Sequence, residues 1–290
     1  MTTRDECRPR LAICFALASM LLLLCGCSLR RPTPPALRPP TFAVLADIQY
    51  GDKETQGARH FRTSLLRLQD GVTDLAQRDL AFVIQLGDIV DGQAKDLPKT
   101  IADQEAVLQV LARQPAPVYH VLGNHCLNLG KDRLQQRYNV ERFYYDFTVA
   151  RAPGWRFVVL DGNDAGYGVL GAEQLAWFTA TLERAAAAHE RVVCFCHFAL
   201  LAEAAPNHRM ATPTPVLEIM DRSACVVAWF AGHDHAGGYA VRNGVHHVTV
   251  KGLVEAPETG AHGLVELYPD HLREIGVGSE PNRDLPLPAR

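Results

Sequence analysis

The sequence predicts an α/β fold in which two mixed β-sheets pack face to face and helices cover their outer faces. In the first half of the chain, short apolar runs alternate with longer amphipathic stretches, which is the pattern of strand, helix and strand. The last third contains mostly short apolar runs, so we expect strands there. With 290 residues and a hydrophobic content of 48%, the chain can bury one substantial core. Together these observations predict an α/β/β/α sandwich.

The expected elements follow one another closely along the chain. In the first half, strands are predicted at 42–46, 81–86 and 118–122, and helices at 59–78 and 99–113. In the second half, strands are predicted at 143–148, 157–160, 192–196, 226–231, 245–250 and 264–268, and one helix at 173–189. No internal repeat or second linker interrupts this order. We therefore expect a single domain over residues 41–290.

The first 26 residues have the pattern of an export signal. Arg4, Arg8 and Arg10 precede an apolar run over 11–24, and small residues follow it. The run has about 14 residues, whereas a helix needs roughly 20 to span a bilayer. A cleaved signal over residues 1–26 is therefore the expectation, and a permanent transmembrane helix is the weaker alternative.

The end of this signal, Leu24-Cys25-Gly26-Cys27, resembles a bacterial lipobox, in which the last cysteine is lipidated. We expect an exported lipoprotein that is anchored to a membrane through Cys27 and faces the bacterial periplasm. Ordinary secretion or an uncleaved anchor are the alternatives. Residues 27–40 are rich in proline, which favours an extended linker that would hold the domain away from the membrane.

Composition excludes some partners and some chemistry. The formal net charge of −3 comes without a basic stripe, so we expect no binding to nucleic acid. No protein partner is evident either. Four cysteines lie in the expected domain, at positions 126, 194, 196 and 225, and they form no C-x-x-C pair. Buried thiols are therefore expected rather than a zinc or redox site.

Five segments share one design, in which a side chain that can bind a metal ion follows an apolar strand directly. The residues concerned are Asp47 and Gln49, Asp88 and Asp91, Asn124 and His125, His197, and His233 and His235. The carboxyl ends of strands in α/β sheets are where ligands bind, so we expect these side chains to meet at one rim. A single aspartate after a strand is commonly a turn residue. Five such segments together predict a site of carboxylate, amide and imidazole groups.

These motifs resemble the pattern of calcineurin-like metallophosphoesterases, which reads D-x-H, G-D-x-x-D, G-N-H-D/E, H and G-H-x-H. The corresponding segments here are Asp47-Ile48-Gln49, Gly87-Asp88-Ile89-Val90-Asp91, Gly123-Asn124-His125-Cys126, His197 and Gly232-His233-Asp234-His235. Gln49 stands in place of a histidine, and Cys126 in place of an acidic residue. The resemblance implies a calcineurin-like α/β/β/α sandwich and a phosphohydrolase.

The glutamine is similar to that of the manganese-dependent ADP-ribose/CDP-alcohol diphosphatase subfamily. The segments LADIQYGD, HFRTSLLRLQ, QLGDIVDG and WFAGHDHAGGY also look like that subfamily. The similarity spans nearly all of residues 41–280. It weakens between Ala202 and Pro215, the stretch that approaches the active-site mouth in that subfamily.

The resemblance implies two divalent metal ions that share Asp88 as a ligand. One ion would be held by Asp47, Gln49, Asp88 and His235, and the other by Asp88, Asn124, His197 and His233. A hydroxide that bridges the two ions would attack phosphorus in line. Because the amide of Gln49 offers an oxygen ligand where the wider family has an imidazole nitrogen, Mn²⁺ is the expected metal.

Two further residues are expected to act without binding metal. His125 would stabilise the transition state or protonate the leaving group, which suits an imidazole near neutral pH. Asp91 would orient His125 or a ligand. For both residues a purely structural role is the alternative.

The expected reaction is hydrolysis of the phosphoanhydride in nucleoside diphosphate conjugates such as ADP-ribose and CDP-alcohols. One alternative is a phosphodiesterase or phosphomonoesterase that acts on cyclic nucleotides or other phosphate esters, since the same metal chemistry serves them all. Another alternative is a lipoprotein that binds metal or nucleotide without catalysis.

Several other polar residues are not expected in the site. His120 is predicted to be a packed core histidine, and Asp234 to be a solvent-facing loop residue. Arg62, Arg67 and Arg78 are predicted to form a solvated helix face. Cys126 is left open as either a reactive thiol or a buried one, because reactivity depends on its surroundings.

Overall fold

The computed structural model describes residues 38–92, 96–256 and 260–288. The expected signal over residues 1–26, with Cys27, and most of the linker therefore lie outside the described residues. Residues from Pro39 onward form one compact unit. None of the helices in the described ranges is long and apolar enough to cross a membrane.

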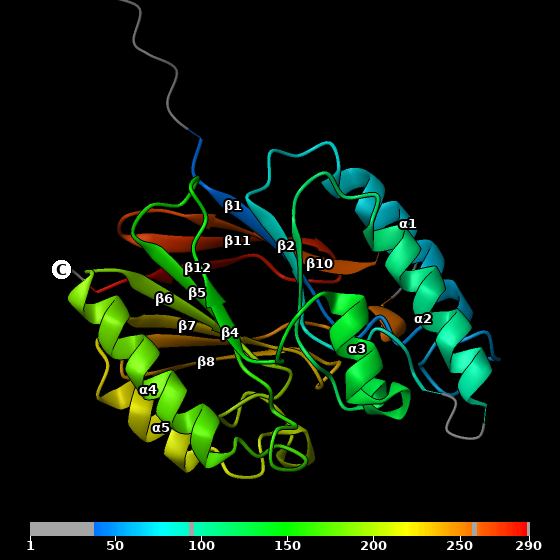
Figure 1. Cartoon of the computed structure of the whole chain (residues 1–290). Helices are drawn as coiled ribbons and strands as arrows, with labels where there is room; N and C mark the ends of the chain where they lie inside the picture. Colours follow the sequence, from blue (N-terminus) through cyan, green and yellow to red (C-terminus); the bar gives the residue numbers. More distant parts are fainter. Residues whose placement is uncertain (1–37, 93–95, 257–259, 289–290) are drawn as a thin grey trace, which may run out of the picture. The chain divides into compact units, whose positions relative to one another are not determined.

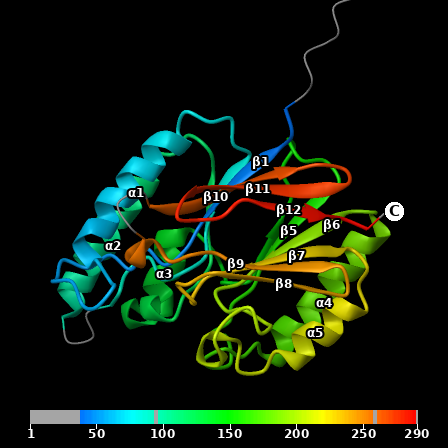
Figure 2. The ribbon, with the colours of Figure 1, turned by 180° about the vertical axis from the view of Figure 1, so that it is seen from behind.

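The first sheet is mixed, with parallel strands at one edge and antiparallel strands at the other. Its strands lie in the order β12, β11, β10, β1, β2, β3. Their bounds are β1 Thr41–Leu45, β2 Phe82–Gln85, β3 Val118–His120, β10 Ala261–Leu267, β11 His271–Gly278 and β12 Arg283–Pro286. Strands β1, β2 and β3 are parallel, whereas β10 is antiparallel to β1. Figure 2 shows β10, β11 and β12 beside one another.

The second sheet is also mixed, in the order β4, β5, β6, β7, β9, β8. Its strands are β4 Tyr145–Phe147, β5 Trp155–Val159, β6 Arg191–Phe195, β7 Val226–Ala231, β8 Gly238–Arg242 and β9 Val245–Thr249. The run β5, β6, β7, β9 is parallel, and both edge strands pair antiparallel. Within each sheet, the parallel strands therefore end at a common rim.

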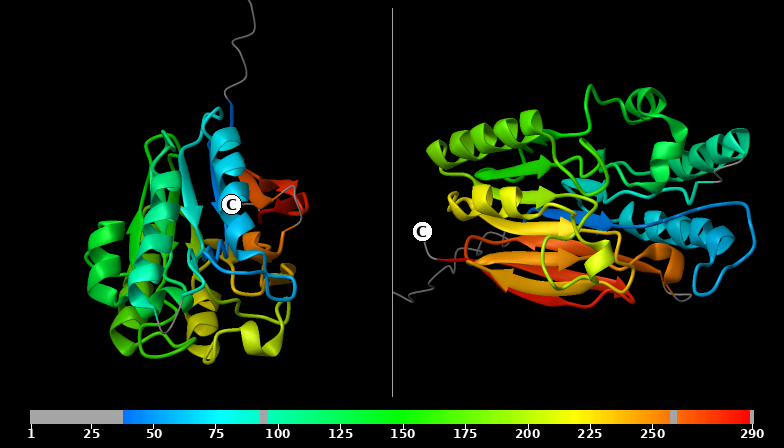
Figure 3. Two further views of the ribbon diagram at one scale, coloured as in Figure 1. Left: turned by 90° about the vertical axis from the view of Figure 1, so that its right-hand side faces the viewer. Right: turned by 90° about the horizontal axis from the view of Figure 1, so that it is seen from below.

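Helices cover the outer faces of both sheets. The helices are α1 Phe61–Leu75, α2 Leu97–Leu111, α3 Lys131–Tyr138, α4 Ala172–Ala187 and α5 Thr214–Asp221. The first three pack on the first sheet and the last two on the second. Figures 1 and 3 show the α1/α2 pair and the α4/α5 pair on opposite sides of the strands. The expected α/β/β/α sandwich is confirmed.

The side chains of β1 point alternately to the two faces of the first sheet, so each face of the sheet has its own apolar core. Phe42 and Val44 point into the core between the sheets, where Phe42 stacks on Phe82 with ring centroids 4.9 Å apart. Ala43 and Leu45 point to the other core, under the helices. A strand buried on both faces reads as a continuous apolar run, which is how β1 appears in the sequence.

Five elements were not predicted, namely α3, α5, β8, β11 and β12. Helix α3 is strongly polar, and its buried side chains are Leu134 and Tyr138. Strand β8 lies at a sheet edge and has no buried residue. Neither element has the apolar periodicity on which the predictions rest.

Candidate metal centre

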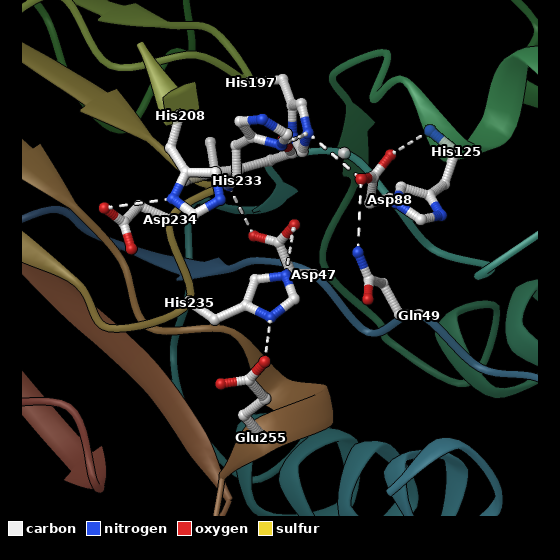
Figure 4. A network of polar contacts seen from close by, with 12 residues as sticks. Asp47, Gln49, Asp88, His125, His197, His208, His233, Asp234, His235 and Glu255 are labelled. Atoms are coloured by element: carbon white, nitrogen blue, oxygen red, sulfur yellow. Dashed lines mark hydrogen bonds and ion pairs between the residues drawn. The ribbon is translucent and has the colours of Figure 1, made fainter. Parts of the chain in front are cut away.

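Every predicted ligand lies just beyond the carboxyl end of a parallel strand. Asp47 and Gln49 follow β1, Asp88 follows β2, and Asn124 follows β3. In the other sheet, His197 follows β6, and His233 and His235 follow β7. Figure 4 shows Asp47, Gln49, Asp88 and the three histidines converging from these strand ends. The predicted meeting of the five segments at one rim is present.

The tightest part of the cluster surrounds the Nε2 atom of His197. This atom lies 3.2 Å from Asp88 Oδ2, 3.1 Å from Asn124 Oδ1 and 3.1 Å from His233 Nδ1. Potential ligand atoms of Asp88, His197 and His233 all lie within 4.8 Å of one another. Four ligand-type atoms from four segments thus face one point, which is the arrangement a divalent cation needs.

A second group adjoins the first and shares Asp88 with it. Asp47 Oδ1 lies 3.5 Å from His235 Nε2, and the Gln49 amide nitrogen lies 3.4 Å from Asp88 Oδ2. Asp47 Oδ1 and Gln49 Oε1 are buried and accept no hydrogen bond from the described residues. Within the same residues, Asp47 Oδ1 has only the ion-pair contact with His235, and Gln49 Oε1 has no polar partner. A buried acceptor without a hydrogen bond is costly, so both oxygens fit the coordination of a cation.

Each histidine of the cluster has a hydrogen-bond partner on the nitrogen that faces away from it. His197 Nδ1 lies 2.8 Å from the Leu86 carbonyl oxygen. His235 Nδ1 lies 2.9 Å from Glu255 Oε1, and His233 Nε2 lies 2.5 Å from the Tyr167 hydroxyl. Such partners fix the orientation and tautomer of metal-binding imidazoles. The inward nitrogens are thereby left as electron-pair donors.

Backbone strain is concentrated in the same residues. Seven non-glycine residues in the described ranges have positive φ, and four of them are Asp47, Gln49, Asp88 and His233. Their φ values lie between 40° and 67°. This left-handed region is uncommon for residues other than glycine and costs free energy unless the surroundings enforce it. The strand ends turn sharply at these residues and bring the side chains together.

Two motif glycines are explained by close packing inside the cluster. A Cβ atom on Gly123 would lie 2.1 Å from Asp88 Oδ1, and one on Gly232 would lie 2.6 Å from Asp47 Oδ2. Any side chain at these positions would displace a carboxylate. The glycine before Asn124 and the glycine before His233 therefore give space to a ligand from another strand.

The electrostatics show a site that requires positive charge. Burial opposes ionisation of Asp47 and Asp88, but the neighbouring imidazoles outweigh it and hold the pKa of both carboxyls below its usual range. Burial alone would lower the pKa of His197 and of His235, but the adjacent carboxylates raise both to about 9. Burial and the charge on His197 lower the pKa of His233 to about 3. Protons on His197 and His235 place positive charge beside the two carboxylates, and bound cations would supply that charge in their place.

His125 lies beside the cluster and contacts it through its backbone. Its N–H donates to Asp88 Oδ1 at 2.8 Å, while its Nδ1 lies 2.5 Å from the Asp91 carbonyl oxygen. The Asp91 carboxylate lies 3.5 Å from the same nitrogen and forms an ion pair with Lys53. Asp91 is thus placed to orient His125. Lys53 was not singled out in the sequence, because it lies six residues beyond Asp47 in a loop without a motif.

Two expectations about polar residues outside the site are wrong. Asp234 does not face solvent, because only 7% of it is exposed and its carboxylate accepts hydrogen bonds from the backbone of Ala205 and Ala236. Arg67 is not part of a solvated face, because it is 8% exposed. The loop after β7 and helix α1 each pack against segments that the sequence does not place next to them.

Three other expectations have a clear outcome. His120 is packed but only half-buried: it stacks on Tyr138 at 4.3 Å, and desolvation lowers its pKa to about 4. Arg62 and Arg78 are exposed, as expected. Cys126 is fully buried, and burial raises the pKa of its thiol to about 12, so its thiolate is disfavoured.

Comparison with known proteins agrees with this geometry. The family model of calcineurin-like phosphoesterases matches residues 40–237. The manganese-dependent ADP-ribose/CDP-alcohol diphosphatase of Oryza sativa subsp. japonica is 32% identical, over 81% of this chain and 90% of the relative. The protein of the same name from Bos taurus is 30% identical, over 84% of this chain and 93% of the relative.

A solved structure shows the same fold. The chain matches a dimetal phosphatase from Danio rerio with a TM-score of 0.79 and 24% identity, over 87% of this chain and all of that one. The fold, the matched family model and the curated relatives lead to one assignment: the chain belongs to the calcineurin-like phosphoesterase family and is a metal-dependent hydrolase.

Proposed function

We propose that the protein hydrolyses the phosphoanhydride bond of nucleoside diphosphate conjugates, with ADP-ribose and CDP-alcohols as the substrate class. The observation that supports this most is the pair of adjoining ligand groups that share Asp88 and contain an unpaired Gln49 oxygen. The names of the curated relatives support the substrate class. A nucleoside monophosphate and a phosphorylated partner would be the products.

Two divalent ions fit the residues that are present. One would be held by Asp47, Gln49, Asp88 and His235, and the other by Asp88, Asn124, His197 and His233. When bound, such ions activate water and neutralise charge on the attacked phosphate. Gln49 and Asn124 contribute neutral amide oxygens, which suit harder ions, so Mn²⁺ is the proposed metal.

The protein's own groups supply positioning and proton transfer. Asp91 accepts from His125 Nδ1 through its carbonyl oxygen, so the other ring nitrogen of His125 is the one that can exchange a proton. The His125 side chain is 27% exposed, so substrate can reach it. His125 is therefore the proposed acid for the leaving group, with Asp91 and Lys53 orienting it.

A substrate panel tests the proposed reaction. The purified full-length chain, loaded with Mn²⁺, is assayed against ADP-ribose, CDP-choline, a cyclic nucleotide and bis-p-nitrophenyl phosphate. Preference for the first two supports the proposal. Preference for either of the last two would favour a phosphodiesterase, and metal binding with no turnover at all would favour a binding protein.

Metal exchange tests the choice of manganese. Protein stripped of metal should regain activity with Mn²⁺ better than with Zn²⁺, and Gln49→His should shift the preference toward Zn²⁺ because imidazole suits zinc. Full recovery with Zn²⁺ and none with Mn²⁺ in the unaltered chain would contradict the choice.

We also propose that the chain is exported and anchored by a lipid on Cys27, with the domain facing the periplasm. The support is the sequence alone: a short apolar run after arginines, the LCGC end and the proline-rich linker. Labelled palmitate should be incorporated into the unaltered chain and not into Cys27→Ser. Unchanged membrane attachment of Cys27→Ser would refute the anchor.

A further inference from the structure

Tyr167 holds an unusual position at the edge of the metal centre. It lies in the loop between β5 and α4, and its hydroxyl is 2.5 Å from His233 Nε2. Its ring packs edge-on against Phe198, with centroids 4.9 Å apart. Half of the residue is nevertheless exposed. The polar end of Tyr167 is therefore fixed on a candidate ligand while part of its ring stays open to solvent.

The loop of Tyr167 is held in place by the stretch between Ala202 and Pro215. The backbone N–H groups of Ala211 and Thr212 donate to the Gly168 carbonyl oxygen at 2.8 and 3.3 Å. Gly168 has a φ of 67°, and a Cβ there would lie 2.5 Å from the Ala211 nitrogen. The stretch between Ala202 and Pro215, which resembles the subfamily least, thus supports the loop that carries Tyr167.

The same stretch brings a second ring to the cluster. The His208 ring lies 5.1 Å from that of His233 and nearly perpendicular to it. Asp234 fixes this stretch, because its carboxylate accepts from Ala205 N at 2.7 Å and lies 3.5 Å from His208 Nδ1. Figure 4 shows His208 between Asp234 and His233. Tyr167 and His208 both contact His233, which gives the site an aromatic edge.

An exposed tyrosine bonded to a histidine does not by itself indicate a site, as Tyr239 shows. Tyr239 on β8 is 43% exposed, and its hydroxyl lies 2.9 Å from His246 Nδ1. The other ring nitrogen of His246 lies 2.8 Å from the Pro286 carbonyl oxygen, so this histidine serves the fold. The other nitrogen of His233 faces His197 instead. Tyr167 differs because its partner belongs to the ligand cluster.

We propose that Tyr167 is a stacking contact for the nucleobase of the substrate, and that its hydroxyl positions His233. This rests on the proposed function, because only a substrate that joins a nucleoside to the attacked phosphate would bring a base next to the cluster, where the exposed ring of Tyr167 lies. An aromatic face stacks on any base, and such contacts are favourable without hydrogen-bond readout. The hydroxyl keeps the ring at this edge and leaves His233 Nδ1 directed at the cluster.

Two ligands that differ only in the base test the ring. AMP and ribose 5-phosphate are titrated by calorimetry into the full-length, Mn²⁺-loaded protein. We expect AMP to bind about tenfold more tightly, a typical effect of one stacked base. Tyr167→Ala should bring the ratio close to one, and Tyr167→Phe should preserve it. Equal binding of the two ligands by the unaltered chain, or an unchanged ratio in Tyr167→Ala, would overturn the base contact.

Manganese affinity tests the hydroxyl. Tyr167→Phe keeps the ring but removes the hydroxyl that contacts His233, so the Mn²⁺ site that contains His233 should lose roughly tenfold in affinity. Unchanged Mn²⁺ affinity in Tyr167→Phe would overturn the positioning role. Tyr239→Phe and Tyr239→Ala are the matched controls and should change neither quantity. Because both readouts are binding constants, they remain informative if the substrate panel shows a different reaction.

Discussion

The two sheets contribute different chemistry to the metal centre. Every candidate oxygen ligand, from Asp47 to Asn124, follows a strand of the first sheet, and every candidate imidazole follows β6 or β7 of the second. The first sheet supplies negative charge, and the second would supply neutral nitrogen donors once bound ions replace the protons on its imidazoles. Shared ions would therefore join the two sheets at one rim, so metal binding and packing of the sandwich are expected to depend on each other.

The strongest test of this division is Asp88→Asn, which removes the carboxylate shared by both ligand groups. Because metal stabilisation of the transition state is worth several kcal/mol, kcat should fall by more than about 10³-fold. Calorimetry should show fewer than two Mn²⁺ ions per chain. Asp74→Asn, on helix α1, is the control and should have neither effect. Two Mn²⁺ bound normally by Asp88→Asn would exclude a shared ligand.

His125→Ala tests the residue that follows the first sheet but supplies no ligand atom. Loss of a proton donor should lower kcat by about 10²-fold or more while Mn²⁺ affinity stays the same. The measurement is kcat alongside a Mn²⁺ titration, with His271→Ala as control, because His271 begins β11 and none of its contacts among the described residues reaches the cluster. A large loss of Mn²⁺ affinity would show instead that His125 is a ligand.

Glu255→Gln tests how the second sheet's histidines are oriented. Glu255 contacts His235 Nδ1 at 2.9 Å, so the change keeps the shape but removes the charge. Loss of such a partner typically costs 10- to 100-fold in metal affinity, and we expect a fall on that order for one Mn²⁺ site. Glu266→Gln on β10 serves as the comparison variant. Equal Mn²⁺ affinity in the two variants would show that Glu255 does not support metal binding.

The smallest expected effect is the gain in thermal stability on Mn²⁺ binding. This gain tests directly whether bound ions hold the two sheets together. With Mn²⁺ at about 100 times its dissociation constant, binding should stabilise the fold by about 2.7 kcal/mol. For a domain of this size the midpoint of thermal unfolding should rise on the order of 5–10 °C and return when the metal is chelated. Asp88→Asn should show little of this shift. A similar shift in Asp88→Asn would indicate metal binding elsewhere.

The sequence predicted the candidate ligand residues but not the residues that hold those ligands in place. Asp47, Asp88, His197 and the paired histidines follow apolar strands at once, so each could be found from local pattern alone. Glu255 ends a short 3-10 helix and Tyr167 lies in a loop, and they bear on the site only through contacts with residues 20 and 66 positions away. Nothing in their own neighbourhood along the chain signals such a contact.

The fold shows the same limit. Strand β1 is a continuous apolar run and helix α1 is amphipathic, and both were predicted, whereas edge strand β8 and polar helix α3 depend on tertiary packing. Asp234 was misplaced for a related reason, because its burial comes from a stretch that folds back from Ala205. Local pattern determines which residues enter a core, but not which distant loop covers a polar side chain.

The pairing of β1 has a consequence for when the metal can be acquired. This strand delivers Asp47 and Gln49, yet it lies between β2 and β10, with Thr41 opposite Glu266. A nascent chain therefore contains its first two ligands early, but β1 has both of its neighbouring strands only after residue 266 has been made. Contacts this far apart in sequence slow folding, because they require the closure of a long loop. We therefore expect the metal centre to reach its final geometry only after the last strands of the first sheet have been made.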